Sequence, residues 1–526
     1  MSRLKRGQVS WLWITVGVFS ILAAALVLLA TRQGAGVTAD SIVYYNAADF
    51  LLEGKGISRL AAEVGYKPVT HFPPLYPAVL AGMRLLGFEI DTAARMLNAG
   101  LLFGLVWLTA YLLPRREYGP WTRVVGAALV GLSPILLDVF SWAMSEPLYI
   151  AAMLLSLAGG SAYLRSGDRK SLVLAGLAAA AAYLTRYSGL AGIACLGAVF
   201  LFLPTQPWRR KMMDLVIFVI TAIGPVVMWM VRNLIVAGSA TNRQLAWHPI
   251  SLTELKRWFH ILFAWLLPFE FTHSALLFTI GVFALFLAGI LLVQFRNRFQ
   301  PLAAYLKQLP DHPLRLLTGW FSLIYALMIM ASISLFDAST PLNFRITSPM
   351  YVSLLLYALT HMPGRLEWYR DDRRHRLAML MIILLVGSYA YRSVALASEL
   401  SKDAQGYASS LLIPSSQVEL IQSLPDDIVI YSNNLEAMYY FYDRAALIVP
   451  SETDAVSQLE NEGFSQELDA MRLTLASGRG VLIIFYSRQR EGYPPPVLVE
   501  GLELIYNQYD VMIFTGSGMG ERFYPE

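Results

Sequence analysis

The stretch Trp11–Ala30 reads WLWITVGVFSILAAALVLLA and contains no charged residue. An apolar helix of about 20 residues is long enough to cross the hydrocarbon core of a bilayer. Arg3, Lys5 and Arg6 precede it, so a signal peptide is the alternative interpretation. The stretch is long for a signal core, however, and no small-residue cleavage pattern follows it. We therefore expect a retained first membrane helix.

Further apolar runs indicate that the chain crosses the membrane repeatedly. Of its 526 residues, 56% are hydrophobic and 15% are charged, whereas a soluble protein carries about 25% charged residues. The runs predict an α-helical polytopic membrane protein with eleven spans. They lie near 11–30, 92–113, 122–137, 144–164, 171–186, 189–204, 212–236, 272–295, 314–336, 345–361 and 375–397.

Clusters of Arg and Lys support this count, because with eleven spans they all fall on the side of the N-terminus. They are Arg3/Lys5/Arg6, Arg115/Arg116/Arg123, Arg165/Arg169/Lys170, Arg209/Arg210/Lys211, Arg296/Arg298/Lys307/Arg315 and Arg365/Arg370/Arg373/Arg374/Arg376. The positive-inside rule makes that side cytoplasmic. We expect a multi-pass protein of the cell (plasma or inner) membrane. The net charge of +4 is carried by these topology signals, so nucleic acid is not expected as a partner.

The opposite side then holds a long first loop and the C-terminal tail. Within the loop, 31–91, the segment 40–54 (DSIVYYNAADFLLEG) predicts a helix that ends at Gly54 and lies in the interface plane. A second short apolar segment follows Pro73 and Pro74 at 75–86, for which another interfacial helix and a partial re-entry into the membrane are the two alternatives. Shorter outer loops are expected near 138–145 and over 237–271.

The tail has a different character from the rest of the chain. Apolar β-like runs at 428–431, 446–449, 481–485 and 511–514 alternate with helical patterns at 435–442 and 455–476. This alternation predicts a small α/β domain. We expect a transmembrane domain over 1–397 and a soluble extracytoplasmic α/β domain over 398–526. The one cysteine, Cys195, lies in an apolar run, so no disulfide can form within the chain.

Five ionisable residues lie at similar predicted depth near the outer side: Asp40, Glu146, Arg186, Arg232 and Arg345. Taken singly, each has a structural explanation, because an arginine at a helix end extends to the interface and an acid in a first turn favours the helix. Charge near membrane depth is nevertheless costly and usually has a purpose or a partner. Two carboxylates and three guanidiniums at one depth predict a site for an anionic headgroup beside a general base.

Seven short motifs follow one another along the first 360 residues. They are DSIVYYNAA at 40–48, HFPPLYP at 71–77, ARMLN at 94–98, SEPLY at 145–149, TRYSGL at 185–190, the set Pro225, Trp229, Arg232, Asn233 and Gly238, and Arg345 with Pro349. In this order they resemble the GT-C glycosyltransferases, in particular the group of bacterial protein O-mannosyltransferases and the aminoarabinose transferase (families 39 and 83). Ile346 stands where that group has a tyrosine, which weakens the last match. The tail lies outside the resemblance.

The resemblance implies an enzyme that transfers a sugar from a polyprenyl-phosphate donor to an acceptor hydroxyl, with inversion, on the extracytoplasmic face. The acceptor would be a protein, a lipid or a polysaccharide, and membrane lipids would surround the site. Asp40 falls at the position of the catalytic aspartate, where it would act as general base. Arg186, Arg232 and Arg345 would hold the lipid phosphate, because the guanidinium fork pairs with phosphate oxygens. Glu146 would orient a sugar hydroxyl or a basic partner.

Two further residues and the cofactor complete the expectations. Tyr44 would stack on the sugar or anchor the interface, and His71 would bind substrate or make a structural hydrogen bond in the loop. No cofactor is expected, and a divalent metal is not favoured, because the histidines lack metal-ligand spacing.

Two other function classes remain open. A transporter or flippase for a lipid-linked sugar would use the same arginines, but it needs polar residues through the middle of the membrane, and few occur in the span centres. A non-catalytic membrane anchor that displays the tail as a binding module would leave the motifs of the first loop without a cause.

Overall fold

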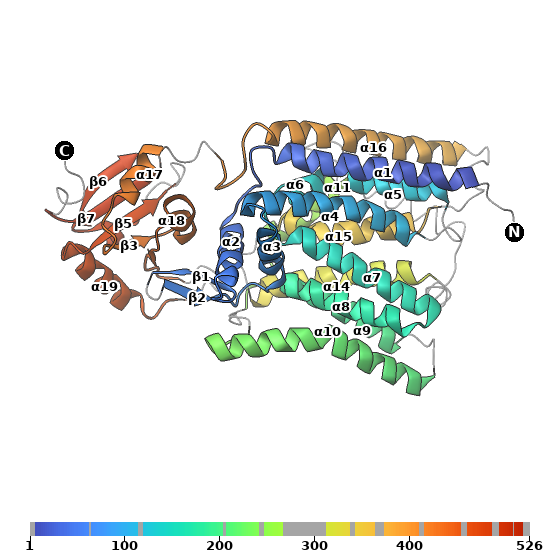
Figure 1. Ribbon diagram of the computed structural model, residues 1–526, viewed down its shortest axis with the longest axis horizontal. Coiled ribbons are helices and arrows are strands. Elements are labelled where there is room, and N and C mark those ends of the chain that lie inside the picture. Colours follow the sequence, from blue (N-terminus) through green and yellow to red (C-terminus); the bar gives the residue numbers. More distant parts are fainter. Residues whose placement is uncertain are drawn as a thin grey trace.

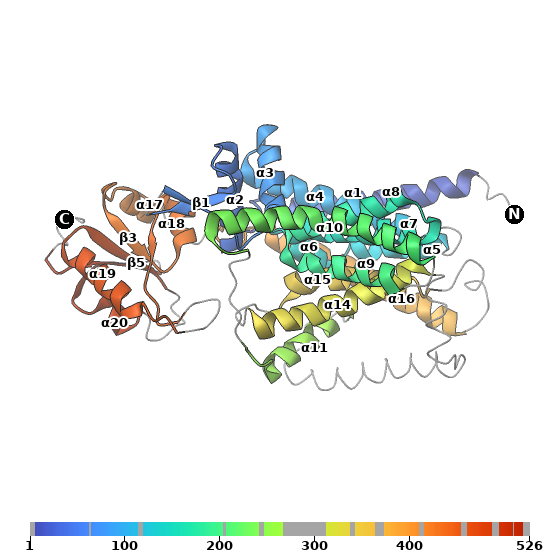
Figure 2. The same cartoon turned by 90° about the horizontal axis from the view of Figure 1, so that it is seen from below.

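The computed structural model describes residues 6–62, 65–113, 119–202, 207–240, 247–266, 312–336, 342–362, 373–409, 415–453, 460–486, 494–508 and 510–518. The molecule has a helical bundle at one end of its long axis and a sheet domain at the other, and the N- and C-termini lie at opposite ends (Figures 1 and 2).

The bundle contains the helices that can cross a membrane. Among the described residues six helices are long and apolar enough, and a seventh span results if a helix pair bent by 47° is counted as one. The six helices are α1 (Arg6–Ala30), α4 (Ile90–Leu112), α7 (Glu146–Ser166), α10 (Trp208–Ala237), α14 (Pro313–Leu335) and α16 (Arg373–Leu400), and the bent pair is α5 (Pro120–Gly131) with α6 (Pro134–Phe140). The chain is therefore a polytopic α-helical membrane protein.

Three shorter helices also belong to the bundle: α8 (Arg169–Thr185), α9 (Leu190–Phe202) and α15 (Phe344–Leu359). Each lies at a run that we predicted as a span, and the predicted run 272–295 lies outside the described residues. With 13 and 16 residues α9 and α15 fall short of a full crossing by length, and α8 with 17 residues lies at the lower limit of about 17. The figure of eleven spans therefore stays a prediction.

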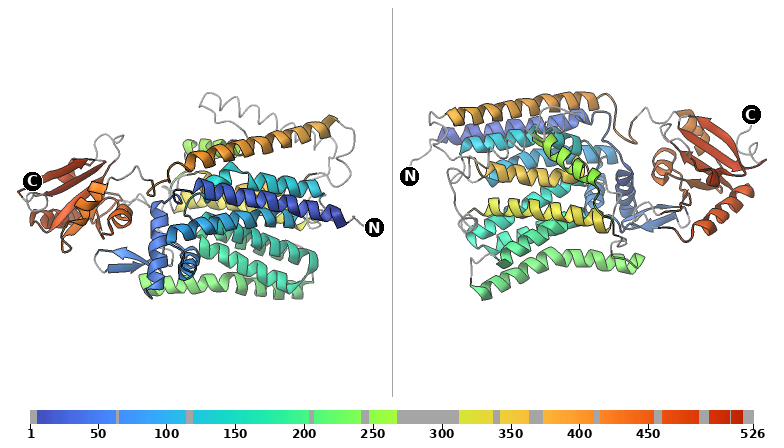
Figure 3. Two further views of the ribbon diagram at one scale, coloured as in Figure 1. Left: turned by 45° about the horizontal axis from the view of Figure 1, so that its top comes forward. Right: turned by 180° about the vertical axis from the view of Figure 1, so that it is seen from behind.

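Small residues allow close packing within the bundle. A Cβ atom on Gly159 of α7 would lie 2.9 Å from the backbone of Ala175 in α8, and one on Gly176 would lie 2.0 Å from the Thr221 hydroxyl in α10. Helices in a bilayer associate through such close approach rather than through the hydrophobic effect. Along another side of the bundle, α1 runs next to α16, so the first and last membrane helices are neighbours (Figure 3).

The first loop forms a layer across one end of the bundle. Helices α2 (Ala39–Leu52) and α3 (Leu75–Leu85) stand nearly perpendicular to the bundle helices, as expected for interfacial helices (Figure 1). Thr38 and Ser41 form a reciprocal capping box at the start of α2, and Gly54, with φ of +77°, follows its end. Between the two helices lies a hairpin of β1 (Ser58–Ala61) and β2 (Gly65–Pro68), which the sequence did not predict.

The outer loop that we predicted over 237–271 contains a helix, α11 (Leu252–Leu266). The apolar face of α11 explains why a helix forms here, because Trp258, Ile261 and Trp265 follow helical spacing and are buried in the bundle core.

The C-terminal region is a mixed sheet with helices on both faces. Five strands lie in the order β4 (Leu447–Ile448), β3 (Val429–Ser432), β5 (Gly480–Phe485), β7 (Val511–Gly516), β6 (Leu502–Gln508), with β3 parallel to β4 and β5, and β7 antiparallel to β5 and β6. On one face α17 (Ser415–Gln422) and α18 (Leu435–Tyr442) bury apolar side chains against β3 and β5, and on the other α19 (Phe464–Ala476) does so; the short α20 (Pro496–Val499) precedes β6. The predicted α/β alternation is present, whereas β6 and α17 were not predicted. Residues 455–459 of the predicted helix 455–476 lie outside the described residues, and α19 begins at Phe464.

Candidate active site

Three chain segments that are far apart in sequence meet beside the N-terminus of α2. In the middle lies the strand-like segment that precedes α2: Gly36 exchanges backbone hydrogen bonds with Ser141 and Ala143 on one side, at 2.9 and 2.8 Å. On its other side Val37 donates to Gln405 at 3.0 Å and accepts from Tyr407 at 2.9 Å. We call this arrangement the three-segment bridge. It fixes the backbone just before Asp40 between the segment that leads into α7 and the linker that leads into the sheet domain.

Glycines make this close approach possible. A Cβ atom on Gly406 would lie 2.2 Å from the carbonyl oxygen of Val37, and the φ of Gly406 is +63°. A Cβ atom on Gly36 would lie 2.5 Å from the ring of Trp142. Real side chains do not tolerate such distances, so both positions require glycine.

Four of the five ionisable residues that the sequence selected form one network, which we call the outer cluster: Asp40, Glu146, Arg186 and Arg345. Arg186 Nη1 and Arg345 Nε both lie 2.8 Å from Glu146 Oε1. Arg345 Nη2 donates to Asp40 Oδ2 at 3.2 Å. The four residues come from the start of α7, the junction of α8 and α9, the first turn of α15 and the first turn of α2.

Within the outer cluster, Glu146 is buried and Asp40 is partly exposed. The Glu146 side chain is 1% exposed, and a buried carboxylate needs compensating charge, which the two guanidiniums supply. Asp40 and Arg345 are 32% and 29% exposed. Glu146 Oε2 has no hydrogen-bond partner among the described residues. An anion that approaches from the Asp40 side would meet guanidinium groups that Glu146 already holds in place.

Tyr44 contacts this network through one residue that the sequence argument missed. The Tyr44 hydroxyl and the Ser145 hydroxyl share a hydrogen bond of 3.2 Å, and Ser145 Oγ accepts from Arg186 Nη1 at 3.1 Å. Burial raises the pKa of Tyr44, and the charge of Asp40 raises it further, so the phenol stays protonated. The signal for Ser145 was its place directly before Glu146 in SEPLY.

The ring of Tyr44 does not offer a free stacking surface. It is 2% exposed and packs against Phe72 at 4.9 Å and Tyr76 at 5.1 Å between ring centroids. The His71 ring in turn packs against Phe72, with 4.3 Å between the ring centroids. Tyr44 therefore belongs to the small core under α2 and α3, and His71 flanks that core.

Arg232 is the residue that the structure places elsewhere. Its Nη1 donates to the Val69 carbonyl at 2.9 Å and its Nη2 to the Ile57 carbonyl at 3.1 Å, while the guanidinium lies 4.8 Å from the Trp229 ring centre. These contacts hold the two ends of the β1–β2 hairpin. Of the three guanidiniums, Arg186 and Arg345 contact the acids, whereas the two Nη atoms of Arg232 donate to backbone carbonyls. A role for Arg232 in binding the phosphate stays a prediction.

No group of three or more His, Cys, Asp or Glu side chains with the geometry of a metal site occurs in the part of the chain that the structure describes. What the outer cluster offers chemically is a partly exposed carboxylate beside two fixed guanidiniums. That combination can accept a proton and stabilise an anion at the same place.

Comparison with known proteins supports the fold. No protein-family model and no curated protein matches the sequence. Among solved structures, ArnT from Cupriavidus metallidurans matches in its apo state with a TM-score of 0.59 at 14% identity, covering 97% of this chain and 98% of ArnT. The same protein bound to undecaprenyl phosphate gives 0.58 at 15% identity, with 98% and 99% covered.

The archaeal oligosaccharyltransferase AglB from Archaeoglobus fulgidus, in complex with an inhibitory peptide and a dolichol-phosphate, matches with a TM-score of 0.55 at 12% identity. The match covers 98% of this chain and 75% of AglB. Identities this low establish the fold alone. Because the matches extend over nearly the whole chain, the protein has the fold of the GT-C membrane glycosyltransferases.

Proposed function

We propose that this protein is an integral membrane glycosyltransferase that transfers a sugar from a polyprenyl-phosphate donor to an acceptor hydroxyl. The observation that carries the proposal is the outer cluster, which joins Asp40 to Arg345, and Arg345 to Glu146 and Arg186, in a chain of this fold. Two of the similar structures hold a polyprenyl-type phosphate, undecaprenyl phosphate in ArnT and dolichol-phosphate in AglB, which supports the donor class.

In the proposed reaction Asp40 removes the proton of the acceptor hydroxyl as its oxygen attacks the anomeric carbon. The bond between that carbon and the phosphate oxygen breaks, and the oxygen leaves with the electron pair as polyprenyl phosphate. Attack opposite to the leaving group inverts the anomeric centre. Arg186 and Arg345 stabilise the charge that develops on the phosphate, and such preorganised contacts contribute most where charge appears during the reaction.

The ion pair between Arg345 and Asp40 implies an order of events, in which the donor binds before Asp40 acts as base. Without donor, the guanidinium lies 3.2 Å from the carboxylate and competes with an acceptor for it. A donor phosphate attracts the same guanidinium and thereby releases Asp40 to act as base. Glu146 keeps hold of both arginines throughout, because its buried oxygen contacts each of them at 2.8 Å.

The proposed sidedness follows from the basic clusters of the sequence. Helix α2, which has Asp40 in its first turn, and the sheet domain lie toward the end of the molecule away from the N-terminus (Figure 1). We place that end outside the cytoplasm, with residues 1–397 as catalytic domain and 398–526 as extracytoplasmic domain.

The test uses the full chain in sealed proteoliposomes with a panel of polyprenyl-phosphate sugars and mixed acceptors. Chromatography of the lipids should show released polyprenyl phosphate for at least one sugar, in proportion to sugar transferred. A donor that crosses the bilayer uncleaved, with no polyprenyl phosphate released from any member of the panel, would instead establish a flippase.

A further inference from the structure

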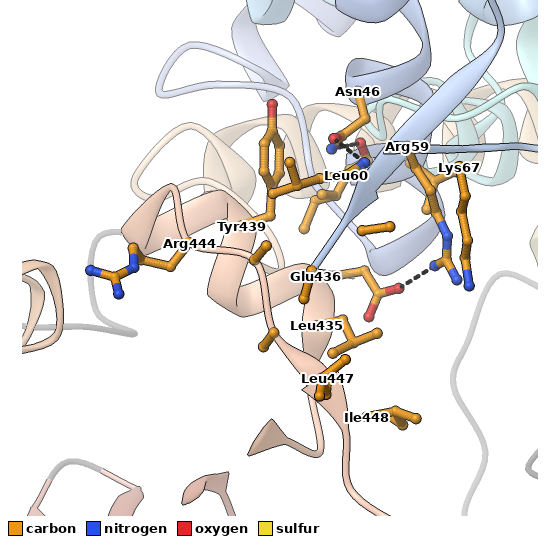
Figure 4. A pocket seen from close by; sticks show the side chains of 16 residues that line it. Asn46, Arg59, Leu60, Lys67, Leu435, Glu436, Tyr439, Arg444, Leu447 and Ile448 are labelled. Atoms are coloured by element: carbon orange, nitrogen blue, oxygen red, sulfur yellow. Dashed lines mark hydrogen bonds and ion pairs between the residues drawn. The ribbon is translucent and has the colours of Figure 1, made fainter. Parts of the chain in front are cut away.

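A second site lies outside the outer cluster, between the first-loop hairpin and the sheet domain. It is a cavity of about 170 Å³, lined by α2, the β1–β2 hairpin, α18 and the residues around β4 (Figure 4). Helix α2 contributes Ile42 and Asn46 to its wall, whereas Asp40, one turn earlier, contacts Arg345. The cavity and the outer cluster therefore adjoin two different faces of the same helix.

Two cations stand side by side on one wall of this cavity. Arg59 and Lys67 are directly opposite each other in the register of the β1–β2 hairpin. Residues directly opposite in an antiparallel pair project from the same face, and like charges there destabilise the pair. Figure 4 shows both side chains extending in the same direction. An anion bound between them would offset their repulsion.

Among the described residues, one acid, Glu436, lies against this wall. Glu436 of α18 approaches Arg59 to 3.7 Å, a long ion pair between partly exposed groups. Arg444 also lines the cavity, but its guanidinium points away in Figure 4 and donates to the carbonyls of Leu424 and Pro425, each at 2.7 Å. Arg59, Lys67 and Glu436 together carry one net positive charge.

Most of the remaining lining is apolar, apart from Asn46 and Tyr439. Leu435, Leu447 and Ile448 lie on the side of the sheet domain, away from Arg59 and Lys67, and Leu60 closes the hairpin side (Figure 4). The Asn46 amide is already occupied, since it donates to the Ile42 carbonyl and accepts from the Leu60 backbone. A ligand that fits must present an anionic group to one wall and a C–H face to the other. A sugar ring that bears a phosphate or a carboxylate has both.

We propose that this cavity binds an anionic sugar unit of the acceptor and so holds the acceptor beside α2. The proposal rests on the proposed function, because it takes the ligand to be the acceptor of that transfer. Binding here uses a part of the acceptor that does not react, and such remote binding energy positions the reacting hydroxyl.

The test measures binding to the purified full chain in lipid nanodiscs without any donor, so that a protein with no transferase activity still reports on the cavity. Isothermal titration compares glucose 6-phosphate and glucuronate with neutral glucose and with inorganic phosphate. The anionic sugars should bind about tenfold more tightly than glucose, in line with one charge-assisted contact. Inorganic phosphate should bind more weakly than glucose 6-phosphate, because it lacks the C–H face.

Variants assign the effect to the cavity. The double variant Arg59→Gln/Lys67→Gln should lose the preference for charged sugars. The matched control is Lys55→Gln, a half-exposed lysine of the same loop that pairs with Glu53 and does not line the cavity, and it should keep the preference. Glu436→Gln removes the competing carboxylate and leaves both cations, so it should strengthen binding of the charged sugars about threefold.

The outcomes that overturn the proposal are distinct. If glucuronate and glucose bind with equal affinity, or if the double variant keeps the preference for charged sugars, the cavity is not an anion site. If the double variant does not fold, weaker binding of the charged sugars to Glu436→Gln would also show that the cavity is not an anion site. If inorganic phosphate binds as tightly as glucose 6-phosphate, the cavity does not recognise a sugar, and the proposal is wrong in that part. None of these results bears on release of polyprenyl phosphate, which tests the outer cluster alone.

Discussion

Among its described residues the bundle has two buried carboxylates that each lie near two guanidiniums, and the two differ in how many of their oxygens have hydrogen-bond partners. At the end near the N-terminus, Asp214 of α10 accepts from Tyr163 at 2.8 Å and from Arg169 at 2.7 Å, and Arg210 lies 3.6 Å away. Both arginines are about half-exposed. We call this group the inner cluster. Glu146 in the outer cluster is as deeply buried, but its arginines are more shielded and one of them also contacts Asp40.

The comparison shows that a buried ion pair in a membrane helix does not by itself indicate a site. In the inner cluster both carboxylate oxygens have partners and the arginines extend to the bundle end, which is how a structural anchor is built. In the outer cluster a second acid is partly exposed, and neither oxygen of the buried Glu146 carboxylate has a hydrogen-bond partner among the described residues, although Oε1 lies within ion-pair distance of both arginines. The difference lies in the capacity to accept another group.

The largest expected effect separates the two clusters by removing one acid from each. Asp40→Asn keeps the size and removes the base, so the rate of sugar transfer should fall about 10²–10⁴-fold. Asp214→Asn is the control and should leave the rate per folded molecule unchanged, because Arg169 and Arg210 can be hydrated. Transfer of a labelled sugar measures both, with gel filtration as the check on folding. Equal losses in the two variants would contradict the distinction.

A smaller effect is expected when charge is kept but the guanidinium fork is lost. Arg345→Lys cannot contact Asp40 and Glu146 through two nitrogens at once, so kcat/KM for the donor should fall about 10–100-fold. Arg169→Lys should change it little, since Tyr163 and Arg210 also contact Asp214. The comparison would fail if Arg345→Lys retained full kcat/KM.

The three-segment bridge provides a third test, because it positions Asp40 without touching substrate. Gly406→Ala forces a methyl group against the Val37 carbonyl and should lower kcat about tenfold by displacing Asp40. Gly54→Ala is matched in its positive φ but meets nothing within 4 Å, so it should cost only about 1 kcal/mol of stability. Steady-state kinetics at saturating donor, together with thermal unfolding, distinguish the two. An unchanged kcat in Gly406→Ala would show that the three-segment bridge does not position Asp40.

The smallest effect concerns the contact between the sheet domain and the first loop. Burial raises the pKa of Tyr439 to about 12, and Asp49 of α2 adds to the rise. The folded state holds this proton more tightly than the unfolded state, so the contribution to stability is full below pH 10 and is lost as the pH rises toward 12. Tyr439→Phe should flatten the loss of melting temperature in this window. An identical pH profile in the variant would contradict the assignment.

Parts of this structure could be predicted because their patterns are local. Helix α18 matches the predicted 435–442, and α2 lies within one or two residues of its predicted bounds, since periodic apolar residues and Gly54 mark them. Strands β3, β5 and β7 follow from short apolar runs. The β1–β2 hairpin could not be predicted, because β2 is exposed along its length and carries no alternating apolar pattern.

The site could be predicted only to the extent that depth determines position. The order of apolar runs and basic clusters predicts that acids and arginines lie at one level of the membrane, and four of them do meet: Asp40, Glu146, Arg186 and Arg345. Depth says nothing about position around the bundle, so it could not predict that Arg232 contacts carbonyls of the first loop rather than the acids. The contact of Gly406 with Val37 left no trace in the sequence either, because a backbone bridge between single residues imposes no side-chain pattern.

The three-segment bridge also bears on biosynthesis. The segment before Asp40 leaves the ribosome early, while its partner around Gly406 follows the last membrane helix, so almost the whole membrane domain is made between them. During insertion, the polypeptide that carries Asp40 waits at the bilayer surface with one edge unpaired. A nascent chain that stalls before the linker would therefore hold every residue of the outer cluster and still lack the strand that fixes it.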